Sequence, residues 1–323
     1  MEAGEGARTT RGGMLRPTSE ADLAEAVAGA RGPLAVRGGG TRPVGAPVSG
    51  EALSTAGLSG VTLHEPGALT LVAAAGTELA EVERMLAAEG QRLPFEPMDH
   101  RRLLGTDGAP TIGGIVAANV SGPRRVQAGA CRDFLLGVRF VDGTGTVIRN
   151  GGRVMKNVTG YDLVRLICGS RGTLGVLTEV ALKVLARPEA EATLVARGRG
   201  AEAGVAALTA ALGTPYDVSG AAHLADGVAG AEARTQVRVE GLADSVAYRA
   251  GRLRDGVLEG FEIVEGAASA ALWEEVRDVT PFAGGFGPVW RVSVRPTDGP
   301  RLTAALEDEG VAHRAILDWG GGL

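Results

Sequence analysis

Three glycine-rich segments hold the residues of this 323-residue chain best suited to chemistry. The first is Val-Arg-Gly-Gly-Gly-Thr at 36–41, and the second is Pro-Thr-Ile-Gly-Gly at 110–114, with Asn-Val-Ser-Gly following at 119–122. The third runs from 169 to 177. Because glycine has no Cβ, its backbone N–H groups can approach an anion closely, and several converging N–H groups would bind the diphosphate of a dinucleotide. Each segment alone could equally be a tight turn in a chain with 51 glycines, so the prediction depends on all three.

Other common catalytic sites are excluded by residue type and spacing. The two lysines, Lys156 and Lys183, do not follow glycine, which excludes the Walker A loop of P-loop NTPases. The four histidines are scattered and form no His-Glu-x-x-His motif, so the sequence predicts no metal site. There is no Gly-x-Ser-x-Gly turn of a serine hydrolase and no Cys-x-x-Cys motif of a redox dithiol.

A second nucleotide-binding interpretation remains open. Gly-Arg-Gly-Ala-Glu-Ala at 198–203 matches the loose Rossmann fingerprint, after a possible strand and before a helix. Asp217 lies about 20 residues further on, the usual spacing of the acid that binds the ribose. It precedes its expected strand, however, whereas the ribose acid belongs at the strand's carboxyl end. The pattern therefore favours a plain turn over an NAD site.

Length and composition indicate a two-domain globular protein of the cytoplasmic type. The apolar fraction is 45%, the charged fraction 22% and the net charge −5, which does not favour nucleic acid or an anionic membrane as a partner. No apolar run approaches the roughly 20 residues of a membrane span, and the N-terminus does not read as a signal peptide. Two cysteines, Cys131 and Cys168, are typical of a reducing compartment.

Strands and helices must bring the glycine segments together. Ser19 and Asp22 fit a capping box that begins a helix, and the strand at 34–36 leads directly into the first segment. Thr77 is expected to cap a second helix that ends near Glu89. The other patterns predict strands near 61–64, 69–75, 93–95, 137–141, 146–149, 177–185, 192–197, 218–224, 234–239 and 289–294, and helices near 111–119, 201–212 and 243–255.

The order of the three segments resembles the FAD-binding family of the vanillyl-alcohol oxidase type, which shows Arg-Gly-Gly-Gly-Thr, then Pro-Thr-Ile-Gly-Gly, then Gly-Ser-x-Gly-Thr-Leu-Gly. Lys-Asn-Val-Thr-Gly-Tyr-Asp-Leu at 156–163 resembles the branch of D-lactate and glycolate dehydrogenases. The segments at 96–97, 121–125, 132–134, 152–157 and 318–321 are similar to the small FAD-binding subunits of bacterial glycolate oxidases.

The resemblance implies an α+β fold. A flexible tail at 1–13 would precede a two-part FAD-binding domain of the vanillyl-alcohol oxidase (PCMH) type at 14–188, and a small α+β cap would follow at 189–323. It also implies a complex with a larger FAD-binding subunit and an iron–sulfur subunit, which oxidises glycolate to glyoxylate and lies in the cytoplasm or at the inner membrane through its partners. A standalone 2-hydroxy-acid or sugar oxidase, and a scaffold subunit with non-catalytic FAD, remain as alternatives.

The resemblance also implies the cofactor site. Its residues would be Val36, Arg37, Gly38, Gly39, Gly40, Thr41, Pro97, Thr111, Ile112, Gly113, Gly114, Asn119, Ser121, Gly122, Gly172, Gly175, Val176 and Leu177. Relatives with covalent flavin carry a histidine near the first segment, where this chain has Thr41 and Arg42, so noncovalent FAD is expected. Lys156 could contact the flavin or a partner, or lie on the surface. Tyr161 could contact the cofactor, but a half-buried packing role is expected for it. His100 is the one histidine that could lie near the flavin ring. No residues are assigned to catalysis.

Overall fold

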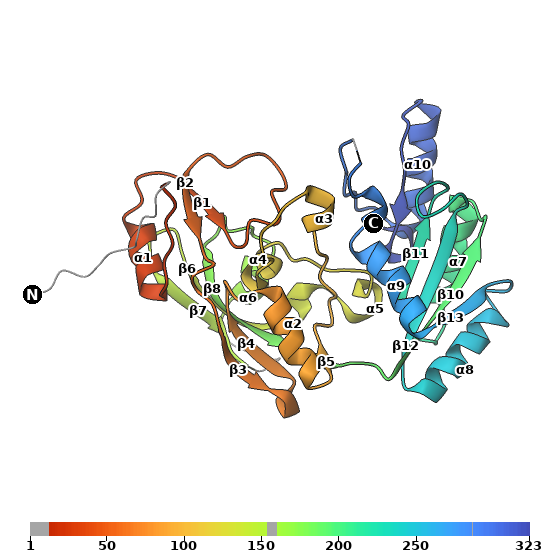
Figure 1. Ribbon diagram of the computed structural model, residues 1–323, viewed down its shortest axis with the longest axis horizontal. Helices are drawn as coiled ribbons and strands as arrows, with labels where there is room; N and C mark the ends of the chain where they lie inside the picture. Colours follow the sequence, from red (N-terminus) through yellow and green to blue (C-terminus); the bar gives the residue numbers. More distant parts are fainter. Residues whose placement is uncertain (1–12, 154–159, 286) are drawn as a thin grey trace, which may run out of the picture. The chain divides into compact units, whose positions relative to one another are not determined.

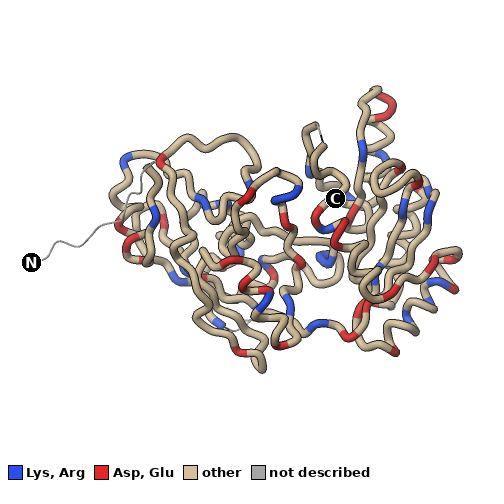
Figure 2. The backbone as a smooth tube through the Cα atoms, in the orientation of Figure 1, with Lys and Arg blue, Asp and Glu red and all other residues tan. Residues whose placement is uncertain are grey.

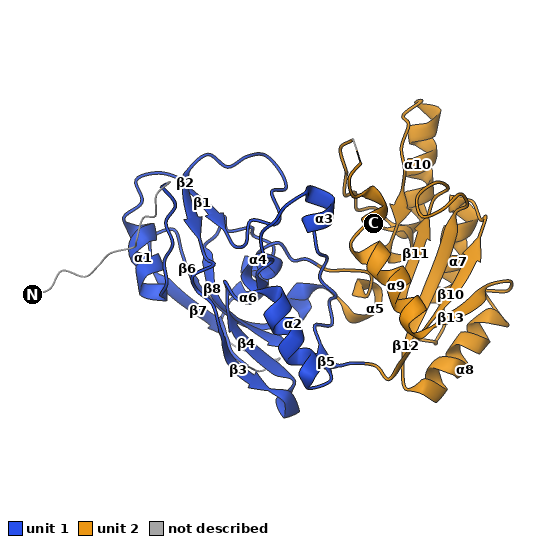
Figure 3. Cartoon of the chain, in the orientation of Figure 1, with its two compact units in different colours: residues 1–120, 130–187 blue, residues 121–129, 188–323 orange. Residues whose placement is uncertain are grey.

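The computed structural model describes residues 13–153, 160–285 and 287–323 and divides the chain into two compact units (Figure 3). Unit 1 comprises the described residues up to Val120 together with Ala130–Arg187, and unit 2 comprises Ser121–Gly129 and Pro188–Leu323. The second unit thus begins beside the expected boundary at 188, but it also includes a nine-residue segment that the sequence placed in the first. The expected tail at 1–13 lies, apart from Gly13, outside the described residues.

Unit 1 is built on a five-stranded antiparallel sheet with the order β3-β4-β8-β6-β7 (Figure 1). The strands are β3 (Val61–Glu65), β4 (Thr70–Ala74), β6 (Leu135–Val141), β7 (Val147–Gly151) and β8 (Val176–Lys183). Central β8 is buried at six of its eight positions, whereas edge strand β7 alternates between exposed and half-buried residues. The predicted hairpin at 137–149 is confirmed as β6–β7.

Two small sheets and short helices complete unit 1. Strand β1 (Leu34–Arg37) pairs in parallel with β2 (Glu51–Ser54), and β5 (Gln91–Arg92) pairs with β9 (Leu185–Ala186). The helices are α1 (Glu20–Ala28), α2 (Leu79–Ala88), α3 (Arg101–Leu104), α4 (Ile112–Ala117) and α6 (Leu163–Ile167), with 3₁₀ turns η1 (Pro66–Ala68) and η2 (Cys131–Asp133).

Two predictions about unit 1 are wrong. The strand expected at 93–95 does not form, because Pro94 has no N–H to donate to a ladder, and the short strand β5 ends just before it. Thr77 does not cap α2, whose N-cap residue is Glu78. The Thr77 hydroxyl instead donates to the Ala74 carbonyl at 2.7 Å, which ties down the end of β4.

Helix α1 is held against the central sheet by its first residue. The predicted capping box is confirmed: the Asp22 N–H donates to Ser19 Oγ and the Ser19 N–H donates to the Asp22 carboxylate, each at 3.1 Å. Glu20 then accepts from Arg139 Nε of β6 at 3.1 Å and from Thr178 Oγ1 of β8 at 2.6 Å. These bonds, the one from Arg139 first, lower the pKa of Glu20 although burial opposes them.

Glu20→Gln is expected to lower the free energy of unfolding by about 1 kcal/mol, since a charge-assisted hydrogen bond at a partly exposed site is lost. Because the folded state lowers the pKa of Glu20 below 4.5, its contribution is present above that pH and is lost as the pH falls through the folded value. Urea unfolding at pH 7 and in acid measures this, with exposed Glu25→Gln on the same helix as control. A Glu20→Gln effect that persists in acid would contradict the ion-pair explanation.

Unit 2 contains a second five-stranded antiparallel sheet, with the order β13-β10-β12-β11-β14. Its strands are β10 (Ala190–Arg197), β11 (Val218–Leu224), β12 (Arg234–Gly241), β13 (Glu262–Glu265) and β14 (Ile316–Leu317). Its helices are α5 (Arg125–Ala128), α7 (Ala201–Leu212), α8 (Ala243–Arg254), α9 (Gly266–Arg277) and α10 (Gly299–Asp308), with 3₁₀ turns η3 (Thr280–Phe282), η4 (Pro296–Asp298) and η5 (Trp319–Gly321).

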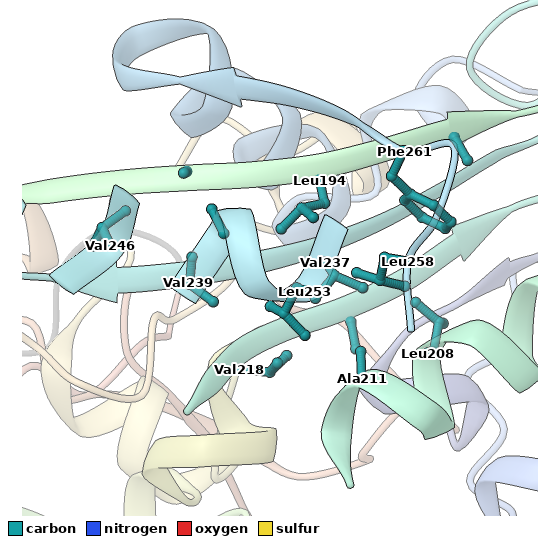
Figure 4. Packing of buried hydrophobic residues seen from close by; sticks show 14 of the residues in the cluster. Leu194, Leu208, Ala211, Val218, Val237, Val239, Val246, Leu253, Leu258 and Phe261 are labelled. Atoms are coloured by element: carbon teal, nitrogen blue, oxygen red, sulfur yellow. The ribbon is translucent and has the colours of Figure 1, made fainter. Parts of the chain in front are cut away.

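The two faces of this sheet differ in chemistry. On one face, α7 and α8 pack over an aliphatic core that includes Leu194, Val237 and Val239 (Figure 4). On the other face, α9 places Trp273 against Ala222 and Leu224. Because side chains alternate along a strand, the residues between the core positions of β12 point to the α9 side, and they are polar.

Two sequence interpretations of unit 2 fail. Every strand pairing in its sheet is antiparallel, and β10 and β11 are not neighbours, so the parallel βαβ unit of a Rossmann NAD site is absent from this sheet. The alternation at 289–294 does not produce a strand, since β14 occupies the position beside β11. Val289, Trp290 and Val292 are left 49, 81 and 44% exposed.

Figure 2 shows acidic and basic residues interspersed along both units, in keeping with the net charge of −5. Within the described ranges, no helix has the length and hydrophobicity needed to cross a bilayer.

Candidate cofactor-binding site

The first and second glycine segments of unit 1 lie backbone against backbone. A Cβ built on Gly38 would lie 2.4 Å from Thr111 Oγ1, and one built on Gly39 would lie 1.5 Å from the Ala109 carbonyl oxygen. The approach is reciprocal, since a Cβ on Gly108 would lie 1.8 Å from the Gly39 carbonyl oxygen. Glycine is therefore required here because the two loops leave no space for a side chain.

The third segment joins the same cluster. Gly172 has a φ of +80°, and a Cβ there would lie 3.6 Å from Cβ of Val36, the first residue of the first segment. The N–H groups of Gly169 and Arg171 donate to the carbonyls of Val116 and Ala117 at the end of α4, at 3.1 and 2.8 Å. The convergence of all three segments is therefore a feature of the folded chain.

Within the second segment, two glycines have different surroundings. Thr111 is the N-cap of α4, and its hydroxyl accepts from the Gly114 N–H at 3.3 Å. Gly113 packs on the end of β4, where an added Cβ would lie 2.6 Å from Ala75. Gly114 is half-buried and has only the Thr111 hydroxyl and Arg42 near its Cβ position. Of the two, Gly114 is the residue that a ligand could approach.

One glycine of the first segment faces open space. Gly40 is exposed and has a φ of +70°, and among the described residues no atom lies within 4 Å of its Cβ position. Its neighbour Thr41 is buried, and the Thr41 carbonyl accepts from Thr106 Oγ1 at 3.2 Å. The loop is thus anchored on one side and open at Gly40, as a backbone cradle for an anion requires.

Asn119 fastens the loops to one another. It has a left-handed φ of +49°, and its Oδ1 accepts from the Arg132 N–H at 3.1 Å. The Cys168 thiol donates to the Val116 carbonyl at 3.2 Å, and it also lies 3.7 Å from Asn119 Oδ1. Asn119 Oδ1 therefore holds the backbone at Arg132, 13 residues further along the chain, and a flavin contact stays a prediction.

Several predicted site residues lie apart from these contacts. Ser121 and Gly122 belong to unit 2, where the Gly122 carbonyl accepts from Trp319 Nε1 at 3.1 Å. Val176 is buried in the core of unit 1, so only its main chain could face a ligand. Three further predicted site residues also lie apart from the loop contacts. Pro97 and Leu177 are buried, and Gly175 packs on Phe140.

Other expectations concern side chains near the flavin. Lys156 lies outside the described residues. Tyr161 is 87% exposed, so the half-buried packing role expected for it is wrong in this structure. His100 is half-buried, and its Nδ1 lies 3.2 Å from the Met98 carbonyl two residues away. In the part of the chain that is described, no group of three or more His, Cys, Asp or Glu residues is arranged to hold a metal ion.

Sequence reasoning missed a pair of cations at the loops. Arg42 follows the first loop directly and donates from Nη1 to the Gly114 carbonyl at 3.2 Å. Its burial and the neighbouring charge of Arg171, in the third segment, lower the pKa of Arg42 to about 10. The signal was present in the sequence as an arginine next to the first glycine loop and one within the third, but nothing in their spacing showed that the charges of the two side chains interact.

A buried polar cluster in unit 2 was also missed. Arg124 donates to both carboxylate oxygens of Glu240, at 2.9 and 3.0 Å, and the guanidinium of Arg238 lies 4.5 Å from the ring centre of Trp273. Burial raises the pKa of nearby Glu191, against the opposing charge of Arg238. The cluster thus contains two arginines, Arg124 and Arg238, and two glutamates, Glu191 and Glu240. Both arginines form ion pairs with Glu240.

The glycine loops fit the diphosphate of a dinucleotide. They supply an anchored backbone that opens at Gly40, and Arg42 and Arg171 supply positive charge beside it. FAD contains such a diphosphate, so the residues present agree with the predicted cofactor.

Comparison with known proteins supports this assignment. The family model described as an FAD-binding domain matches residues 12–151, which confirms the predicted FAD-binding domain. An alkyldihydroxyacetonephosphate synthase of known structure superposes with a TM-score of 0.67 over 83% of this chain and 54% of its own. At 20% identity this likeness concerns the fold alone, and it confirms the predicted fold class.

Sequence relatives are more informative. The chain is 36% identical to glycolate oxidase subunit GlcE of Escherichia coli over 293 residues, which are 90% of this chain and 75% of that protein. It is 36% identical to glycolate oxidase subunit GlcD of Bacillus subtilis over 132 residues, 41% of this chain but 25% of that protein. The rat mitochondrial D-2-hydroxyglutarate dehydrogenase is 35% identical over 57% of this chain and 35% of its own length. The chain therefore belongs to the FAD-binding family of the glycolate oxidase subunit GlcE.

Proposed function

We propose that this chain is the FAD-carrying small subunit of a complex that oxidises glycolate to glyoxylate. The convergence of three glycine loops on an open backbone at Gly40 carries the proposal, because this backbone would form a diphosphate cradle. The first two loops lie inside residues 12–151, the region that matches an FAD-binding domain, and the third packs against them. The identity to GlcE over nine tenths of the chain indicates the substrate class, a small 2-hydroxy acid. Unit 1 would then hold the cofactor, and unit 2 would be the cap.

The residues of unit 1 would divide the cofactor between them. The N–H groups of 38–41 would bind the diphosphate from one side and Gly114 from the other. The main chain at Val176 and Leu177, at the start of β8, would line the adenosine. When bound, FAD supplies an acceptor for the two electrons released by the alcohol. The protein's contribution is to bind and orient it.

Partner subunits complete the proposal. Two relatives of this chain are named as different subunits of glycolate oxidase, GlcE and GlcD, which supports an assembly with a larger FAD-binding subunit. We also include an iron–sulfur subunit as electron acceptor, and a cytoplasmic location, peripheral to the inner membrane through those partners. Copurification of the chain with the products of neighbouring genes tests the assembly.

The flavin is expected to be noncovalent and stoichiometric, because Thr41 and Arg42 stand where a flavin-linking histidine would be needed. Acid precipitation of the purified protein should release all of its yellow colour into the supernatant. Colour retained in the pellet would refute noncovalent binding. Bleaching of the bound flavin by glycolate, by a chemical reductant only, or not at all would separate a substrate oxidase, a relay subunit and a scaffold.

A further inference from the structure

Arg42 and Arg171 form a pair of like charges in unit 1. They are 129 residues apart in sequence, yet the charge of Arg171 acts directly on Arg42. An Nη1 atom of Arg171 also lies 4.0 Å from the Cβ position of Gly45, just beyond the first loop. Within the described ranges, neither arginine forms an ion pair with Asp or Glu. Two guanidinium groups brought together without a carboxylate repel each other.

The polar atoms of Arg42 are incompletely satisfied. Nη1 donates to the Gly114 carbonyl at 3.2 Å, but Nε is buried and, among the described residues, has no hydrogen-bond partner. Arg42 remains protonated at neutral pH, since its pKa stays near 10. A buried guanidinium N–H group that lacks an acceptor is costly unless an anion completes its environment.

We propose that Arg42 and Arg171 together bind the diphosphate of FAD, so that side-chain charge supplements the backbone cradle of the glycine loops. The inference rests on the proposed function, because it assigns residues within the same FAD site. Arg42 is fixed by its bond to Gly114, on one loop, while exposed Arg171 approaches from the third. Guanidinium groups suit phosphate oxygens because their planar N–H donors can make two parallel hydrogen bonds.

A diphosphate is favoured over a substrate carboxylate by charge and position. Two adjacent cations need about two negative charges, which a diphosphate linkage supplies and a single carboxylate does not. Arg42 contacts the second glycine segment at Gly114, and Arg171 is itself a residue of the third segment. The pair therefore belongs with the phosphate end of the cofactor.

The test is a titration of the full chain, depleted of flavin, with three probes. FAD carries flavin, diphosphate and adenosine, ADP carries the diphosphate and adenosine without flavin, and riboflavin carries no phosphate. Arg42→Gln is expected to weaken FAD and ADP by about 10- to 100-fold, the loss of one charge-assisted contact, and to leave riboflavin unchanged. Arg149→Gln, at an exposed arginine on edge strand β7, is the matched control and should bind all three as the wild type does.

Arg171→Glu is expected to raise the stability of the flavin-free protein and to weaken its binding of FAD and ADP. It replaces a repelling neighbour of Arg42 with an attracting one, so the flavin-free protein should melt at a higher temperature than the wild type. The same substitution should weaken FAD and ADP by at least about 10-fold, because the introduced carboxylate would compete with the phosphates for Arg42. Since Arg171 is exposed, this variant keeps the test decisive even if Arg42→Gln folds poorly.

The outcomes separate the inference from the proposed function. Wild-type affinity for FAD in both Arg42→Gln and Arg171→Glu would overturn the inference and leave the FAD subunit intact. Equal weakening of riboflavin would also overturn it, because the arginines would then act on the fold and not on the phosphates. A wild-type chain that binds neither FAD nor ADP would overturn the proposed function, and the inference with it.

Discussion

Isolated from its partners, this chain is expected to oxidise glycolate at least about 100-fold more slowly per bound flavin than the assembled complex, because a positioned base alone contributes roughly 10²–10⁴ in rate. Oxidation of a 2-hydroxy acid also needs a cation that holds the substrate carboxylate. The glycine loops of unit 1 supply a site for the cofactor, but they supply neither of these groups.

Three of the four histidines of the chain have hydrogen-bond partners outside the glycine loops. His64 Nε2 lies 3.0 Å from Gln91 Oε1 beside β3, and His223 is buried against Thr235 in unit 2. His313 is exposed, with Nδ1 2.9 Å from the Val311 carbonyl. In unit 2, Arg124 is committed to Glu240 and so is not a ready clamp for a carboxylate.

Dye reduction with glycolate and with D-lactate, normalised to flavin content, measures the effect in the purified chain and in the reconstituted complex. Chemical reduction of the bound flavin in the isolated chain is the control that its cofactor is redox-competent. Equal turnover per flavin in the two preparations would place the active site in this chain. It would refute the expectation that the base and the carboxylate-binding cation come from the partner subunits.

Gly39→Val is expected to reduce the flavin content of the purified protein to near zero and to destabilise unit 1. A Cβ at this position would lie 1.5 Å from a backbone oxygen of Ala109, and no side-chain rotation can relieve a clash with the main chain. Overpacking of this kind costs about 1–3 kcal/mol or more and would separate the first two loops. Flavin absorbance per protein and the melting temperature measure the two effects.

Gly67→Val is the matched control, since no atom of the described part of the chain lies within 4 Å of the Gly67 Cβ position, and Gly67 does not adopt a positive φ. It should keep both flavin and stability. Gly114→Val is expected to be milder than Gly39→Val for stability, because its nearest neighbour is the Thr111 hydroxyl at 3.1 Å. Wild-type flavin content in Gly39→Val would contradict the close packing of the loops.

Local signals predicted much of the fold. The capping box at Ser19 places the start of α1, and the helix expected at 201–212 forms over the same residues. These succeed because caps and hydrophobic periodicity act within a few residues. The strand expected at 289–294 fails for the opposite reason: its alternation is correct, but a strand also needs a free sheet edge, and only the tertiary fold decides which segment occupies it.

The candidate site shows the same division. The order of the glycine segments predicted that Gly38, Gly39 and Gly114 would lie in one site, and the structure brings their loops together. Arg42 was not predicted, because its meaning depends on Arg171 in a distant segment. Conversely, Ser121 and Gly122 lie only two and three residues after Asn119 in sequence, yet they belong to the other unit.

The assignment of Ser121–Gly129 to unit 2 means that the polypeptide passes from one unit to the other three times, after Val120, after Gly129 and after Arg187. Cutting the backbone after Arg187 would therefore not separate the units. Ser121–Gly129 would still join them, because it belongs to unit 2 and both of its ends continue into unit 1. A fragment that starts at Pro188 would also lack Arg124 and so lose the two hydrogen bonds that this arginine donates to the buried carboxylate of Glu240. Neither unit is thus one continuous stretch of sequence. Recombination that exchanges unit 2 between related genes must transfer both Ser121–Gly129 and Pro188–Leu323.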